Sequence, residues 1–72
     1  MKFYAYITAK NFRDKDEKQK TRLLDFLKNN YPNVTTMEQG SSLLIQGHST
    51  VKEMLEICLY LENNSFGCFT FD

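Results

Sequence analysis

The chain has 72 residues and a formal net charge of zero, with 42% hydrophobic and 25% charged residues. This length forms one small domain, residues 1–72, and leaves no room for a second. No stretch approaches the roughly 20 apolar residues of a membrane span, so we expect a soluble cytoplasmic protein with no membrane partner.

Basic and acidic side chains are distributed unevenly along the chain. Residues 1–28 contain eight basic and four acidic side chains, whereas residues 29–72 contain one basic and five acidic ones. This asymmetry can steer the encounter with a charged partner, although it says little about the fold.

The first predicted element is a strand over residues 2–9. Small or apolar side chains alternate there with polar and tyrosine side chains, and alternate side chains of a strand point to opposite faces. One face holds Phe3, Ala5, Ile7 and Ala9, and the other holds Lys2, Tyr4, Tyr6 and Thr8. We expect the first face to lie beneath helices, because its alanines suit close packing, and the tyrosines to remain outside.

A helix is predicted next. Asp14, with Glu17 three residues later, forms a variant of the capping box that marks a helix N-terminus. The helix should stop just before Tyr31-Pro32. Its apolar stripe consists of Leu23, Leu24, Phe26 and Leu27. The first half of this helix is nearly all charged, so we expect it to project into solvent.

Two short strands, residues 34–39 and 42–46, flank Gly40-Ser41, which predicts a hairpin with a two-residue turn. Thr50 and Glu53 then form a second capping box ahead of a second helix. Its core-facing residues at helical spacing are Val51, Met54, Leu55, Cys58 and Leu61. This position of Cys58 favours a buried thiol over a disulfide with Cys68. The last strand is predicted over residues 66–71.

This order of elements predicts an α+β fold, the ferredoxin-like βαββαβ two-layer sandwich. Both helices would pack on one face of a four-stranded antiparallel sheet with strand order 4-1-3-2. A three-stranded variant, in which one of the short middle strands is frayed, is the main alternative.

In this architecture one face of the sheet is covered by helices and the other is not. We expect Leu43 and Ile45 to point toward the helices, which leaves Tyr4, Tyr6 and Leu44 on the uncovered face. Either of the two alternating sets of side chains on the last strand contains a phenylalanine, so this strand would add at least one to the uncovered face. Tyrosine anchors protein interfaces at little entropic cost, so this face is the first candidate for binding a partner protein or a second copy of the chain. The alternative is that the tyrosines lie flat with their hydroxyls in water, or that a loop or terminus covers them.

A second candidate surface is the charged first helix. Its basic side chains are Arg13, Lys15, Lys18, Lys20 and Arg22. They could contact an acidic protein or a phosphate backbone, although interspersed acidic residues make the net charge weak for phosphate binding. The RNA-recognition motif also requires aromatic-rich segments on the first and third strands, and SSLLIQG has no aromatic and no basic residue.

Catalytic and metal-binding patterns are missing from the sequence. The single histidine, His48, precedes Ser49 and Thr50, but serine and threonine at this place are typical helix caps. One histidine and two cysteines ten residues apart match no zinc spacing. We therefore expect no enzyme, no cofactor, no metal and no small-molecule substrate.

The sequence thus predicts a small, stand-alone, non-enzymatic binding protein. It would act as an accessory or inhibitor polypeptide, of the kind that phages and mobile elements encode, by occupying a partner's surface or by self-association. The alternative is a nucleic-acid-binding domain that uses the basic first helix.

Overall fold

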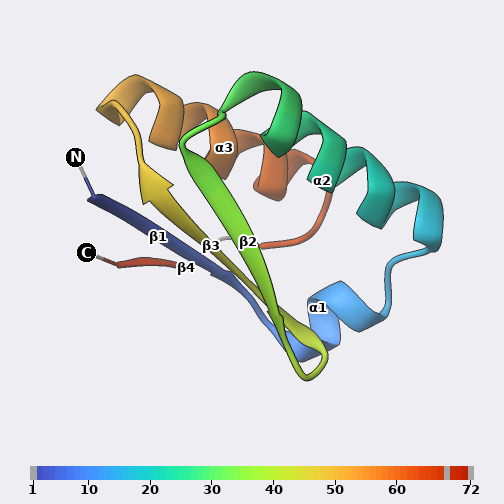
Figure 1. Ribbon diagram of the computed structural model, residues 1–72. Coiled ribbons are helices and arrows are strands. Elements are labelled where there is room, and N and C mark those ends of the chain that lie inside the picture. Colours follow the sequence, from blue (N-terminus) through green and yellow to red (C-terminus); the bar gives the residue numbers. More distant parts are fainter. Residues whose placement is uncertain (1, 68, 72) are drawn as a thin grey trace.

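The computed structural model describes residues 2–67 and the backbone of residues 69–71. The elements in chain order are β1 (Lys2–Ile7), α1 (Ala9–Arg13), α2 (Glu17–Asn30), β2 (Val34–Gln39), β3 (Ser42–His48), α3 (Val51–Asn63) and β4 (Phe69–Phe71). α2 and α3 lie on one side of the sheet, and the short α1 lies at the end of the sheet beside the β2–β3 turn (Figure 1). The result is a small α+β fold.

Three full-length antiparallel strands make up the body of the sheet, with β3 between β2 and β1. The β1–β3 register runs from Lys2 opposite His48 to Ile7 opposite Leu43. The β2–β3 hairpin closes at Gly40-Ser41, as predicted, with Gln39 opposite Ser42. β4 adds only a three-residue segment along the outer edge of β1, opposite Tyr4 to Tyr6.

The prediction of a ferredoxin-like βαββαβ sandwich with four strands and two helices is wrong. The described residues form three helices and three full-length strands. Of the predicted last strand over residues 66–71, Phe69–Phe71 form the short β4, Phe66 and Gly67 are not in a strand, and Cys68 lies outside the described residues. Gly67 has a φ of 72°, a left-handed conformation that interrupts an extended strand. Phe66 is instead 1% exposed and belongs to the core.

The extra helix α1 lies between the predicted first strand and the predicted first helix, where no separate helix was expected. The Thr8 hydroxyl accepts a hydrogen bond from the Asn11 backbone N–H at 3.3 Å, which ends β1 and starts α1. This turn carries Phe12 into the core. Ala9 therefore lies in a helix rather than on the buried strand face, where it was predicted.

The N-terminus of α2 also differs from the prediction. Asp16, not Asp14, is the N-cap, and its carboxylate accepts a hydrogen bond from the Gln19 backbone N–H at 2.8 Å. The Gln19 side chain returns a bond from the Asp16 N–H at 3.3 Å and completes the capping box. Asp14 instead caps the C-terminus of α1.

The core lies between the sheet and the two longer helices. Phe3, Ala5 and Ile7 are buried, as are Leu43 and Ile45, so the predicted phase of both strands is confirmed. The other buried hydrophobic residues are Phe12, Leu23, Leu27, Tyr31, Val34, Ile57, Leu61 and Phe66. Among the described residues, no helix has the length and apolar character needed to cross a bilayer.

The side of α3 that packs against the core differs from the predicted one. The Thr50–Glu53 capping box is present, which confirms where the helix begins. Ile57 and Leu61 are buried, and Met54 packs against them. Val51 and Leu55, which were predicted to face the core, are 54% and 60% exposed.

Candidate functional site

The uncovered face of the sheet is the first candidate site. In the described part of the chain, every helix lies on the other side of the sheet or at its end (Figure 1). Tyr6 is the cross-strand partner of Leu44, which is in turn the partner of Met37. Directly opposite residues of an antiparallel sheet project from the same face. These three side chains therefore form one apolar row across the sheet.

Tyr4 lies beside this row on the same face of β1, two residues before Tyr6, and its cross-strand partner is Gln46. Met37 is 49% exposed, whereas Tyr4, Tyr6 and Leu44 are half-buried. We call Tyr4, Tyr6, Met37 and Leu44 together the open sheet face. Met37 was not among the predicted site residues, although the alternation of β2 beside Leu44 could have identified it.

The open sheet face becomes polar toward one end. The Lys2 ammonium lies 5.9 Å from the centroid of the Tyr4 ring. A shallow hollow of about 220 Å³ continues from there and is lined by Lys2, Tyr4, Thr35, Gln46, Gly47 and His48. A cation beside aromatic and amide groups suits a mixed polar and apolar contact, as is typical of protein interfaces.

The predicted contribution of the last strand to this face falls on residues whose side chains lie outside the described part of the chain. The backbone register places Phe69 opposite Tyr6 and Phe71 opposite Tyr4. Cys68 also lies outside the described residues, so its predicted lack of a bond to the half-buried Cys58 stays a prediction.

Two of the predicted basic residues lie against the body of the protein. The Lys15 ammonium lies 5.3 Å from the centroid of the Phe66 ring. The Lys20 ammonium lies 5.1 Å from the Phe12 ring and 3.7 Å from the Glu17 carboxylate. Both cations thus contact aromatic side chains of the core, which limits their availability to a partner.

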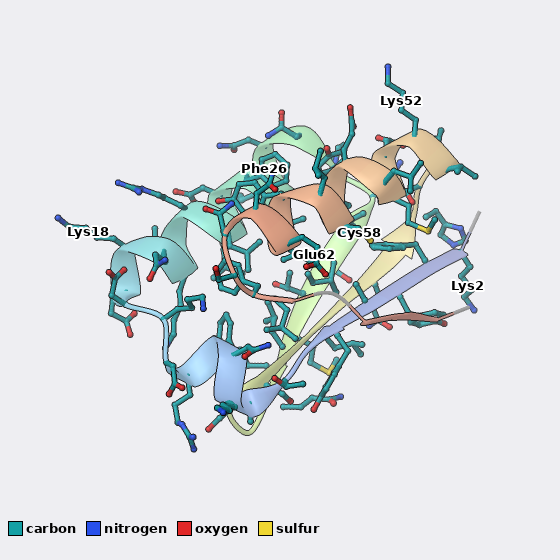
Figure 2. The ribbon with its side chains drawn as sticks, turned by 180° about the vertical axis from the view of Figure 1, so that it is seen from behind. Lys2, Lys18, Phe26, Lys52, Cys58 and Glu62 are labelled. Atoms are coloured by element: carbon teal, nitrogen blue, oxygen red, sulfur yellow. The ribbon has the colours of Figure 1, made fainter. Side chains whose placement is uncertain are left out.

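The remaining basic residues belong to two different elements. Arg13 ends α1, and its Nε lies 3.7 Å from the Asp14 carboxylate. Lys18 and Arg22 lie one turn apart on α2 and line one shallow surface hollow with Glu17 and Thr21. Lys18 points away from the molecule (Figure 2). The predicted basic helix is therefore divided, and only Lys18 and Arg22 are neighbours on one exposed surface.

An exposed apolar stripe on α3 was not predicted from the sequence. Val51, Leu55 and Leu59 are 54%, 60% and 62% exposed. Their spacing of four residues places them on one side of the helix. We call these three residues the α3 stripe. The same spacing is visible in the sequence, but it competes there with the parallel spacing of the partly buried Met54 and the buried Ile57 and Leu61.

The aromatic contacts between α2 and α3 fix the helical layer behind the sheet. The Phe26 ring stacks on Tyr60, with centroids 4.2 Å apart, and meets Tyr31 edge-on at 5.5 Å. The Tyr31 hydroxyl donates a hydrogen bond to Glu56 Oε1 at 3.0 Å. Burial, followed by the hydrogen bond and charge of Glu56, raises the pKa of Tyr31 to about 12. Because the Tyr31 hydroxyl is already hydrogen-bonded to Glu56, we interpret this cluster as a structural contact between α2 and α3.

The loop that follows His48 caps the N-terminus of α3. The Thr50 hydroxyl accepts a hydrogen bond from the Glu53 N–H at 3.1 Å. Ser49 is 7% exposed, and its hydroxyl has no hydrogen-bond partner within the described residues. No group of three or more potential metal ligands gathers in residues 2–67 and 69–71.

Comparison with known proteins yields no relative, because no family model, curated protein or solved structure matches this chain. The function is therefore argued from the geometry alone.

Proposed function

We propose that this chain is a small non-enzymatic binding protein that covers part of a partner protein's surface with its open sheet face. The observation that carries the proposal is the apolar row of Met37, Leu44 and Tyr6 on the face that the described helices leave uncovered. Tyr4 extends this row with a second tyrosine, a residue type that is enriched in protein interfaces.

The row of Met37, Leu44 and Tyr6 is contiguous across three strands, and contiguous apolar side chains on a protein surface mark interaction sites. Tyrosine also brings a large contact area with only two side-chain torsions to immobilise. Both features favour a protein partner over a small ligand. An accessory or inhibitor role in the cytoplasm, and an origin in a phage or mobile element, belong to the same proposal.

Binding of nucleic acid through the basic residues has weaker support. Lys15 and Lys20 contact core aromatic rings, and Arg13 lies beside Asp14. Lys18 and Arg22 alone would neutralise about two phosphates, which gives little affinity at physiological salt.

The proposal is tested by comparing two double variants in affinity capture from the native host, with quantification of the captured proteins. Tyr4→Ser with Tyr6→Ser removes aromatic area from the open sheet face. Leu55→Ser with Leu59→Ser removes a similar number of apolar groups from the α3 stripe and is the matched control. We expect the first variant to lose the specific partner by about tenfold or more, as for interface anchors, and the control to retain it.

Because the tyrosines are half-buried, thermal unfolding must show that the double variant is folded. The more exposed Met37→Lys supplies an independent test that perturbs the fold less. Capture that persists in both open-face variants, or is lost in the α3 control instead, would contradict the proposal.

A further inference from the structure

β2 is an edge strand with little protection against pairing with another chain. It lies at one end of the strand order, and its six residues pair with β3 without a bulge. All residues from Thr35 to Gln39 are exposed. Natural edge strands are commonly protected by proline, charged side chains such as lysine or an inward-pointing charge, bulges or a covering element. In the described part of the chain, β2 has no proline, lysine, bulge or covering element, and Glu38 is its one charged side chain.

The backbone groups that point outward from β2 follow from the hydrogen-bond pattern. The His48 N–H donates to the Asn33 carbonyl at 3.2 Å, so these opposite residues form a hydrogen-bonded pair. Such pairs alternate along an antiparallel ladder. Thr35 and Met37 therefore bond to β3, while the N–H and C=O groups of Thr36 and Glu38 point away from the sheet.

The surface beside this edge is apolar with one cation. A hollow of about 320 Å³ lies between α2 and β2, and its lining includes Leu24, Tyr31 and Thr36 together with Lys28. Thr36 lies opposite the buried Ile45 and Glu38 opposite the buried Leu43, so both side chains lie on the helical side of the sheet. Neither Lys28 nor Glu38 forms an ion pair within the described residues.

These observations define a self-complementary edge. We propose that two copies of this chain associate by antiparallel pairing of their β2 strands, with Thr36 opposite Glu38 of the second copy. This register satisfies the outward N–H and C=O groups of both residues in four intermolecular hydrogen bonds. It also places the second copy's Glu38 beside the hollow that contains Lys28, twice by symmetry.

Alternative registers are less favourable. Pairing Glu38 with Glu38 places two carboxylates directly opposite each other, which is destabilising. Pairing Thr36 with Thr36 of the second copy places Glu38 opposite Val34 of that copy. The Val34 N–H already donates to the Tyr31 carbonyl of its own chain at 3.0 Å. The Glu38 carbonyl would then remain unpaired.

The proposed register has a consequence on the other face of the sheet. Met37 lies opposite Met37 of the second copy, at a non-hydrogen-bonded position where side chains approach most closely. The apolar rows of the two open sheet faces would then join into one surface. The pairing does not depend on the proposed function, because it uses the edge of β2 and leaves Tyr4 and Tyr6 uncovered.

The experiment is the molar mass in solution by analytical ultracentrifugation over a concentration series, for the full chain and six variants. Glu38→Lys and Lys28→Glu each replace two attractive contacts by two repulsive ones. We expect each to raise the dimer Kd by about tenfold, and the combined swap to restore it to within about threefold. Lys18→Glu is the matched control at a distant exposed site and should leave the Kd unchanged.

Thr36→Pro tests the backbone pairing itself. The Thr36 N–H points away from β3, so proline removes an intermolecular donor without breaking the β2–β3 ladder. We expect a folded monomer, as checked by circular dichroism. A wild-type chain that stays monomeric into the millimolar range overturns the proposal, as does a dimer that neither charge reversal weakens. A dimer lost only in Tyr4→Ser with Tyr6→Ser would assign self-association to the open sheet face instead.

Discussion

Gly47 of β3 lies where a side chain would collide with the neighbouring backbone. A Cβ atom there would lie 2.7 Å from the Val34 Cα and would overlap the Asn33 carbonyl oxygen, and the φ of Gly47 is 156°. We expect Gly47→Ala to lower the free energy of unfolding by about 2 kcal/mol or more, because backbone must move to admit the methyl group.

Gly40 supplies the control for this prediction. Its φ is 63°, but no atom lies within 4 Å of a Cβ built there, so Gly40→Ala should cost only about 1–2 kcal/mol of left-handed strain. Urea denaturation measures both values. The steric account of Gly47 fails if its substitution costs less than that of Gly40.

Tyr31 gives the molecule a defined sensitivity to alkaline pH. Its pKa is raised to about 12 in the folded protein by burial and by Glu56, whereas the unfolded chain ionises near pH 10. The unfolded state therefore loses its proton first. The stabilisation is complete below about pH 10 and is lost as the pH rises toward about 12, by an amount on the order of 2 kcal/mol.

Tyr31→Phe separates this effect from the titration of lysines. The difference in unfolding free energy between wild type and variant, measured by urea denaturation from about pH 9 to 11.5, should shrink as the pH rises. A difference that stays constant over this range would show that Tyr31 ionises alike in both states.

At the scale of the elements, α3 offers a direct check on which of its two apolar sides is buried. Ile57 is fully buried, while Leu55 is 60% exposed two residues earlier. We expect Ile57→Ala to lower the free energy of unfolding by about 2–4 kcal/mol and Leu55→Ala by less than about 0.5 kcal/mol. Similar losses at both positions, measured by chemical denaturation, would contradict the orientation of this helix.

Several elements were predictable from local sequence alone. The alternation in residues 2–7, the Gly40-Ser41 turn and the Thr50–Glu53 capping box each have a mechanism confined to a few neighbouring residues. The orientation of α3 was not predictable in this way. Apolar residues occupy two adjacent sides of that helix, and only packing against the sheet decides which side is buried.

The start of α2 shows a different limit. Asp14 with Glu17, and Asp16 with Gln19, are two overlapping capping patterns of equal local quality. Burial of Phe12 selects between them, since the turn that carries Phe12 into the core uses Asp14 to end α1. This choice depends on contacts distant in sequence. The break between α1 and α2 also separates basic residues that a single continuous helix would have presented together.

At the scale of the whole molecule, the two-layer arrangement determines which surfaces are available. Helices on one side leave the open sheet face uncovered on the other (Figure 1). The alternation of β1 made Tyr4 and Tyr6 predictable as its members, and that of β3 did the same for Leu44. Met37 completes the row and also lies on the unprotected edge strand β2. The open sheet face and the β2 edge are thus adjacent surfaces that share Met37.

The central claim, that the open sheet face contacts a partner protein, is tested most directly by site-specific photocrosslinking in the native host. Benzoylphenylalanine is introduced in place of Tyr6 in one chain and in place of Leu59 of the α3 stripe in another. The account predicts a discrete covalent adduct with a partner protein from position 6 and none from position 59. An adduct from position 59 alone, or from neither position, would contradict it.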